Sequence, residues 1–208
     1  METELKPVTN VPASVGVLAL QGDVEEHLHA LARAGAAPRL VKTAAELEAV
    51  DGLIVPGGES TTVIRLLDRF ELAEPLVARV RAGMPFWGTC MGMIVAAHDV
   101  AQLDQATLDL IDITVRRNAF GRQIASEEAD LVIPVLGERP FPGVFIRAPW
   151  VERAGPDVEV LATHRGYGVF VRQGNVIGTS FHPELSGDGR LHEYFIGMVQ
   201  SARKAAAA

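Results

Sequence analysis

The only cysteine of the chain, Cys90, lies in a pattern that suits nucleophilic chemistry. It is the centre of Gly88-Thr89-Cys90-Met91-Gly92, which follows an apolar run and precedes a segment with helical periodicity. A G-x-C-x-G turn between a strand and a helix projects its central side chain out of the sheet. The partial positive charge of a helix N-terminus favours the thiolate, the reactive form of cysteine. We therefore interpret Cys90 as a nucleophile and not as a buried structural cysteine.

A second motif supplies the base that a thiol nucleophile needs and the acid that orients the base. His182 follows the apolar run 176–181 and precedes Pro183-Glu184. Residues two apart in an extended segment point to the same face, so the carboxylate of Glu184 can reach the imidazole of His182. The other histidines show no comparable pattern. His27 and His29 cannot share a helix face, so we expect no metal site there, and we interpret His98, His164 and His192 as structural or exposed.

Alternating strands and helices are expected to position these residues. The expected strands of the first half are 15–20, 39–41, 52–55 and 85–87. The expected helices are one from 24 to a Gly35 cap, a brief one opened by the Thr43-x-x-Glu46 capping box, and two over 72–82 and 91–100. Short connections between such units predict an α/β fold, with a mostly parallel sheet and helices on both faces.

Ligands of such sheets bind beyond the carboxyl ends of the strands. The loops at Gln21, 57–60 and 89–92 all follow expected strands, so we predict that they meet at one edge. The segment 56–60 is not a P-loop, because the lysine and the spacing of that motif are absent. Backbone N–H groups that its glycines leave free can instead hold an oxyanion.

The second half of the chain is rich in strand patterns. The expected strands are 131–135, 144–146, 158–161, 168–171 and 176–180, with turn signals such as Gln173-Gly174-Asn175 between them. They predict antiparallel strands added to the parallel sheet, followed by a helix over 191–204. We expect a flexible leader over residues 1–14, one domain over 15–204 and a tail over 205–208.

Composition excludes several classes of protein. The 208 residues include 19 Lys+Arg and 26 Asp+Glu, and the net charge of −7 argues against nucleic-acid binding. No run of about 18 apolar residues predicts a membrane helix, and residues 1–11 do not resemble a signal peptide. A single cysteine excludes a disulfide-stapled secreted scaffold, so we expect a cytoplasmic protein.

The order GGES, GTC-x-G and HPE along the chain resembles that of the class I (triad) glutamine amidotransferases. Longer segments narrow the resemblance to the family of glutaminase subunits of pyridoxal 5′-phosphate synthase. These segments are 16–22 (GVLALQG), 56–62 (PGGESTT), 117–123 (RNAFGRQ), 144–149 (VFIRAP) and 180–184 (SFHPE). The resemblance covers residues 15–198 and implies a flavodoxin-like fold of the class I amidotransferase type.

The resemblance also implies a role for each residue of these motifs. Cys90 would attack the side-chain amide of L-glutamine and form a thioester, His182 would move a proton to the departing ammonia, and Glu184 would hold His182. The backbone amides of Gly58 and Met91 would form the oxyanion hole, although the family usually has alanine where this chain has Met91. The positions that match glutamine-binding residues of the family are Gly58, Glu59, Ser60, Arg117, Ile146 and Arg147.

The same resemblance implies a partner, and it implies no cofactor and no metal. The ammonia would pass through a channel to a synthase subunit that makes pyridoxal 5′-phosphate from ribose 5-phosphate and glyceraldehyde 3-phosphate. Gln21 matches a position near the oxyanion hole that responds to partner binding.

Two alternatives fit part of the sequence. One is a cysteine esterase or lactonase of the α/β-hydrolase type, which shares the elbow but has the order nucleophile, acid, histidine. In this chain the acid follows the histidine, which favours the amidotransferase. The other alternative is a non-catalytic regulatory module of the same fold, which the intact set of Cys90, His182 and Glu184 disfavours.

Overall fold

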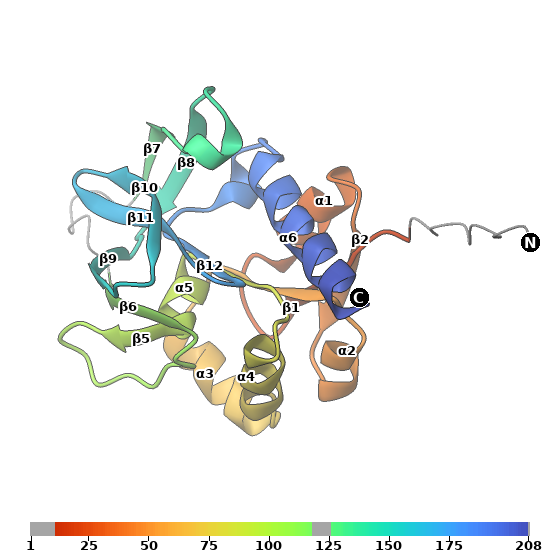
Figure 1. The fold of residues 1–208 in the computed structure, drawn as a ribbon. Helices are drawn as coiled ribbons and strands as arrows, with labels where there is room; N and C mark the ends of the chain where they lie inside the picture. Colours follow the sequence, from red (N-terminus) through yellow and green to blue (C-terminus); the bar gives the residue numbers. More distant parts are fainter. Residues whose placement is uncertain (1–10, 118–125, 208) are drawn as a thin grey trace, which may run out of the picture.

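A twisted sheet runs through the middle of the molecule, with helices on both faces (Figure 1). Within residues 11–117 and 126–207, which the computed structural model describes, this sheet has ten strands. Residues 1–10 of the expected leader, Ala208 and residues 118–123 of the RNAFGRQ segment lie outside the described residues. The order of the strands is β2-β1-β3-β4-β12-β11-β9-β6-β5, and β10 pairs with β11.

The first five strands in this order run parallel to one another and form the centre of the fold. They are β2 (Ala37–Val41), β1 (Ser14–Leu18), β3 (Gly52–Val55), β4 (Phe86–Thr89) and β12 (Val176–Thr179). The other strands of the sheet are β11 (Tyr167–Gln173), β10 (Glu159–His164), β9 (Trp150–Ala154), β6 (Ile111–Arg116) and β5 (Ala97–Val100). A separate antiparallel pair is formed by β7 (Ser126–Leu131) and β8 (Phe141–Ile146). The predicted parallel sheet with added antiparallel strands is confirmed.

Two hydrophobic cores lie on opposite faces of this sheet. One lies under α1 (Val24–Arg33) and α6 (Arg190–Ala206), and the other under α2 (Ala44–Glu48), α3 (Ser60–Arg69), α4 (Ala73–Arg81) and α5 (Met91–Ala96) (Figure 1). Successive side chains of a strand point to opposite faces, so β3 serves both cores: Leu53 and Val55 join one, and Ile54 joins the other. None of the helices in the described ranges is both long enough and apolar enough to cross a membrane.

The predicted signals for turns and helix ends are confirmed. The Thr43 hydroxyl accepts the Glu46 N–H while the Glu46 carboxylate accepts the Thr43 N–H, which completes the capping box. Gly35 follows α1 with a φ of +85°, a conformation that favours glycine. Gly174-Asn175 forms the two-residue connection between β11 and β12.

Several predicted elements differ from the structure. Residues 97–100, expected to end a helix, form β5, because their backbone pairs with β6. Residues 131–135, expected as a strand, contain only the last residue of β7 and part of a 3-10 helix, Pro134–Leu136. Pro134 has no N–H to donate to a strand ladder. The helix α3 and the strands β6 and β9 were not predicted.

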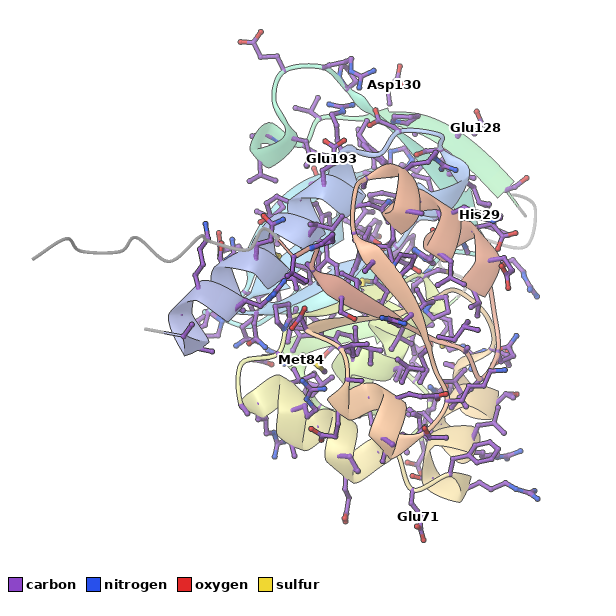
Figure 2. The ribbon with its side chains drawn as sticks, turned by 90° about the vertical axis from the view of Figure 1, so that its right-hand side faces the viewer. His29, Glu71, Met84, Glu128, Asp130 and Glu193 are labelled. Carbon is purple, nitrogen blue, oxygen red and sulfur yellow. The ribbon has the colours of Figure 1, made fainter. Side chains whose placement is uncertain are left out.

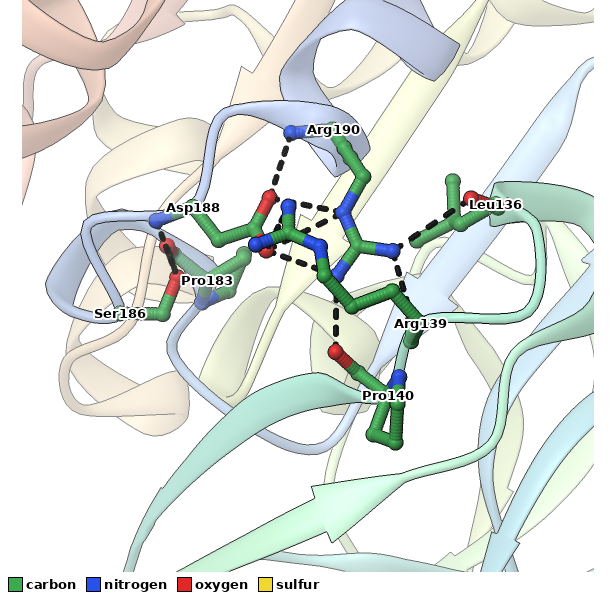
Figure 3. A network of polar contacts seen from close by, with 7 residues as sticks. All are labelled: Leu136, Arg139, Pro140, Pro183, Ser186, Asp188 and Arg190. Atoms are coloured by element: carbon green, nitrogen blue, oxygen red, sulfur yellow. Dashed lines mark hydrogen bonds and ion pairs between the residues drawn. The ribbon is translucent and has the colours of Figure 1, made fainter.

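A polar network fastens the start of α6 to its surroundings (Figure 3). The guanidinium of Arg190 donates to Asp188 Oδ2 at 2.7 Å, and the Asp188 side chain is only 8% exposed. The same guanidinium donates to two backbone carbonyl oxygens, those of Arg139 at 2.7 Å and Pro140 at 2.8 Å. Arg190 thus joins α6 to the turn before β8, next to the 3-10 helix Pro183–Leu185 that carries Glu184.

Arg190→Lys should lower the free energy of unfolding by about 1–3 kcal/mol, because an ammonium cannot replace a planar group that donates to three acceptors at once. Arg139→Lys is the matched control. Arg139 also pairs with Asp188, at 3.1 Å, but its side chain is 72% exposed, so its replacement should change stability little. Urea unfolding followed by circular dichroism measures both variants, and equal losses would contradict the role given to Arg190.

Candidate active site

Two neighbouring parallel strands carry the predicted nucleophile and base. Thr89, the last residue of β4, is in register with Thr179, the last residue of β12. The Cys90 N–H donates to the Thr179 carbonyl at 2.7 Å, which continues the pairing by one residue. His182 therefore reaches Cys90 through strand pairing, although the two are far apart in the sequence.

The backbone at Cys90 has the strained geometry of an elbow. Its φ is +49° and its ψ is −105°, which is rare for a residue other than glycine. A Cβ atom on Gly88 would lie 2.3 Å from the carbonyl of Gly92, and a Cβ atom on Gly92 would lie 2.0 Å from the carbonyl oxygen of Val55. The absence of a Cβ at these two glycines therefore permits the close packing of the elbow.

His182 and Glu184 are buried side by side. His182 Nδ1 lies 2.7 Å from Glu184 Oε1 and 3.3 Å from Asp23 Oδ2, so Nε2 is the ring nitrogen left for Cys90. Burial lowers the pKa of His182, but Asp23, Cys90 and Glu184 outweigh burial and raise this pKa above its ordinary value. Burial raises the pKa of the Glu184 carboxyl, and His182 offsets part of that effect. The site therefore favours an imidazolium beside the thiol.

A cavity of about 340 Å³ lies against Cys90 and His182. Glu184 is the only predicted site residue that does not line it, because its side chain is fully buried. The predicted residues that line the cavity are Gln21, Gly58, Glu59, Ser60, Cys90, Met91, Arg117, Ile146, Arg147 and His182. The loops after β1, β3 and β4 thus meet at one edge of the sheet, and the end of β8 adds a fourth segment.

A polar network joins the loop after β3 to the rest of the cavity wall. Gln21 Oε1 accepts the N–H of Glu59 at 2.8 Å. Arg117 donates to Glu59 Oε1 at 2.9 Å and to Gln105 Oε1 at 3.0 Å. The Ser60 hydroxyl also donates to Gln105 Oε1, at 3.1 Å. Gln105 therefore fixes two of the predicted substrate-binding side chains at once.

Among residues 11–117 and 126–207, four residues of this site were not predicted. Asp23, Ile94 and Pro149 line the cavity, and Gln105 holds part of its wall. Asp23 lies two residues after Gln21, so its place in the loop after β1 was a usable signal. Gln105 lies in a loop without a motif, and its contacts with Ser60 and Arg117 depend on the tertiary fold.

The histidines outside the predicted triad have distinct surroundings. His27 is fully buried in α1, whereas His29 is exposed on the outer side of that helix (Figure 2), so they point to different faces as predicted. The remaining histidines each have a partner that the sequence did not reveal. These pairs are His98 with Asp109 at 2.8 Å, His164 with Glu127 at 3.3 Å and His192 with His27 at 3.1 Å.

The arrangement suits nucleophilic acyl transfer, because a thiol, an imidazole and a carboxylate follow one another at the wall of a cavity. The ligand atoms of Asp23, His182 and Glu184 lie within 4.8 Å of one another, a spacing that a metal ion could bridge. However, the 2.7 Å separation between His182 Nδ1 and Glu184 Oε1 is that of a direct hydrogen bond, which accounts for their proximity.

Comparisons with known proteins agree with this geometry. A protein subunit named pyridoxal 5′-phosphate synthase subunit PdxT from Nocardia farcinica is 57% identical over 196 residues, covering 91% of this chain and 87% of that one. The subunit of the same name from Streptomyces avermitilis is 56% identical over 196 residues, covering 93% and 97%. A solved structure described as a glutamine amidotransferase superposes with a TM-score of 0.85 at 46% identity, covering 89% of this chain and 98% of that one.

The family model matches most of the chain as well. The model of the SNO glutamine amidotransferase family matches residues 17–201, a range that contains both the elbow at Cys90 and the segment with His182 and Glu184. This match and the identity to relatives over nine-tenths of the chain agree with the superposition. The chain therefore belongs to the SNO glutamine amidotransferase family.

Proposed function

We propose that this chain is the glutaminase subunit of a pyridoxal 5′-phosphate synthase and hydrolyses L-glutamine to L-glutamate and ammonia. The contact between His182 and Glu184 beside Cys90, in a chain whose relatives are named PdxT, carries the proposal. Ammonia release from L-glutamine tests it, with a γ-ester of glutamate as the comparison substrate. Hydrolysis of the ester without any release of ammonia from glutamine would favour the esterase alternative, and no turnover of either would favour a regulatory module.

The reaction proceeds through a thioester on Cys90. The thiolate adds to the side-chain carbonyl carbon of glutamine, while the backbone amides of Gly58 and Met91 stabilise the oxyanion. The C–N bond breaks as the imidazolium of His182 gives its proton to the nitrogen, so ammonia leaves and the γ-glutamyl thioester remains. His182 then takes a proton from water, whose oxygen attacks the thioester and releases glutamate. Glu184 holds Nδ1 throughout, so Nε2 carries each transferred proton.

The charged groups of the cavity wall bind the amino-acid end of glutamine. Arg147 has no ion pair within the described parts of the chain, so it can bind the α-carboxylate in a bidentate manner. Glu59, which Arg117 holds at 2.9 Å, offers a carboxylate to the α-ammonium. Ser60 and Ile146 complete the wall around the substrate.

Gln105→Ala should raise KM for glutamine about tenfold with a smaller change in kcat, because Ser60 and Arg117 lose their shared acceptor. Gln102→Ala is the matched control, since Gln102 lies in the same loop and accepts from the neighbouring Arg116 at 3.1 Å. Steady-state ammonia release measures both variants. An unchanged KM in Gln105→Ala would remove this residue from the substrate site.

Ammonia formed in the cavity is delivered to a synthase subunit that makes pyridoxal 5′-phosphate from ribose 5-phosphate and glyceraldehyde 3-phosphate. The relatives are named as synthase subunits, which supports a hetero-oligomeric complex. The position of Gln21 suits a site that responds to this partner. Its side-chain oxygen accepts the N–H of Glu59, the residue after Gly58, whose amide is a proposed oxyanion donor. We further propose that the protein is cytoplasmic, where Cys90 stays reduced. Residues 15–204 would form one catalytic domain.

The isolated chain should be a weak glutaminase, and the synthase subunit should raise its kcat at least about tenfold by ordering the oxyanion hole. Gln21→Ala should reduce this activation more than it reduces the basal rate, because the link to Glu59 is lost. Ammonia release with and without the purified synthase subunit measures both effects. Equal rates with and without the partner would argue against a partner-responsive site.

A further inference from the structure

A buried histidine that the proposed reaction does not use lies behind the triad. His27 belongs to α1 and has no exposed surface. Its Nε2 lies 3.1 Å from the hydroxyl of Thr89, the residue before Cys90, and 3.3 Å from Glu184 Oε2. One ring therefore contacts both the strand that carries the nucleophile and the acid that orients the base.

The second carboxylate oxygen of Glu184 needs a donor. Oε1 is engaged by His182, but Oε2 is buried and has no hydrogen bond within the described residues. The polar group that faces it is Nε2 of His27. A proton on that nitrogen would turn the positive end of an N–H dipole toward the carboxylate, whereas a lone pair there would repel it.

The contacts of the ring favour that proton position. His27 Nδ1 lies 3.1 Å from Nε2 of His192, so one of these two nitrogens donates to the other. If His27 donated from Nδ1, its Nε2 lone pair would face Glu184, and the N–H at Nδ1 of His192 would be buried without an acceptor. If His192 donates instead, His27 carries its proton on Nε2, and His192 leaves only a lone pair unpaired.

The surroundings also keep this pair of histidines neutral. Burial lowers the pKa of His27 well below its ordinary value, and the nearby His192 and His182 lower it further. Burial and the positive charge of Arg33 lower the pKa of His192 to about 4. The ring of Trp87 packs against that of His27 in an edge-to-face arrangement, with 5.8 Å between the ring centres.

We propose that His27 is a positioning residue for the hydrolysis proposed above, whose neutral Nε2–H bonds the Thr89 hydroxyl and stabilises the neighbouring Glu184 Oε2 electrostatically. It acts on the reaction only through Glu184 and the strand before Cys90. By stabilising the carboxylate, it stabilises the imidazolium of His182 and with it the thiolate of Cys90.

Two amide variants separate positioning from packing. In His27→Gln the side-chain amide can reach the place of Nε2, whereas in His27→Asn it reaches only the place of Nδ1. Cys90 is the only cysteine of the chain, so the rate of alkylation by iodoacetamide as a function of pH reports its thiolate alone. His29→Asn, an exposed change on the same helix, is the control.

His27→Asn should react about tenfold more slowly than the wild type at pH 7, with its alkylation midpoint at higher pH, and should lose kcat with little change in KM. His27→Gln and His29→Asn should keep the wild-type profile. Equal profiles in His27→Asn and the wild type, or equal shifts in both His27 variants, would overturn the proposal. Since alkylation needs no substrate, a protein that shows the shift without hydrolysing glutamine would refute the proposed function and leave the role of His27 intact.

Discussion

Replacement of Cys90 by alanine should lower kcat for glutamine hydrolysis by at least about a thousandfold, because no other group can form the thioester. The residue lies at the wall of the cavity with His182 next to it, and although it is buried it belongs to neither of the two hydrophobic cores. The fold should therefore persist, with a free energy of unfolding within about 1 kcal/mol of the wild type. Ammonia release and urea unfolding measure the two effects.

The strained backbone at Cys90 provides an internal control. Alanine has a Cβ and keeps the strain at a φ of +49°, whereas glycine relieves strain that costs about 1–3 kcal/mol at such positions. Cys90→Gly should thus be as inactive as Cys90→Ala but unfold at a higher urea concentration. Retained turnover in either variant would refute the nucleophile assignment, since both lack the thiol.

Motifs that follow buried strands could be predicted well from the sequence. The elbow at Cys90 and the His182-x-Glu184 motif combine short-range patterns with a general rule of parallel sheets, that loops at the carboxyl ends of the strands meet at one edge. The strand order β1-β3-β4-β12 places these loops side by side. The sequence pattern therefore predicted which three loops meet at the cavity, whereas Arg117, Ile146 and Arg147 were expected only from the family resemblance.

Elements whose conformation depends on distant pairing were predicted poorly. Residues 97–100 continue the apolar pattern of α5, yet they form β5 because β6 pairs with them. The missed helix α3 is a different case, since Val63, Ile64 and Leu67 are spaced as on a buried helix face. That spacing was visible in the sequence. It follows directly on the glycine-rich turn of residues 56–60, which predicts a loop and not a helix.

The contacts of His27 could not be predicted, because they join three distant parts of the chain. His27 contacts Thr89, 62 residues away, and His192, 165 residues away. Local patterns carry no information on which buried histidine meets which acid. The contact between Asp23 and His182 could not be predicted for the same reason, since it depends on β1 and β12 lying in one sheet.

Gly92→Ala should damage both the stability and the activity of the protein. Its Cβ would lie 2.0 Å from the carbonyl oxygen of Val55 and 2.9 Å from the carbonyl carbon, so backbone must move. Val55 ends β3 directly before the turn with Gly58, and Gly92 lies two residues after Cys90. We expect a loss of about 2–4 kcal/mol in the free energy of unfolding and a fall in kcat of at least about a hundredfold. Urea unfolding and ammonia release measure both.

Gly197→Ala is the matched control, because it makes the same substitution at a position where the added Cβ meets no other atom. Gly197 lies within α6, and no atom within 4 Å opposes an added Cβ, so alanine there should stabilise the protein by about 0.5–1 kcal/mol. A Gly92→Ala variant as active and stable as Gly197→Ala would contradict the close packing of α5 on β3. Since the nucleophile and the proposed oxyanion amide of Gly58 lie on the two sides of that contact, a shift of about 1 Å there separates them without touching either group.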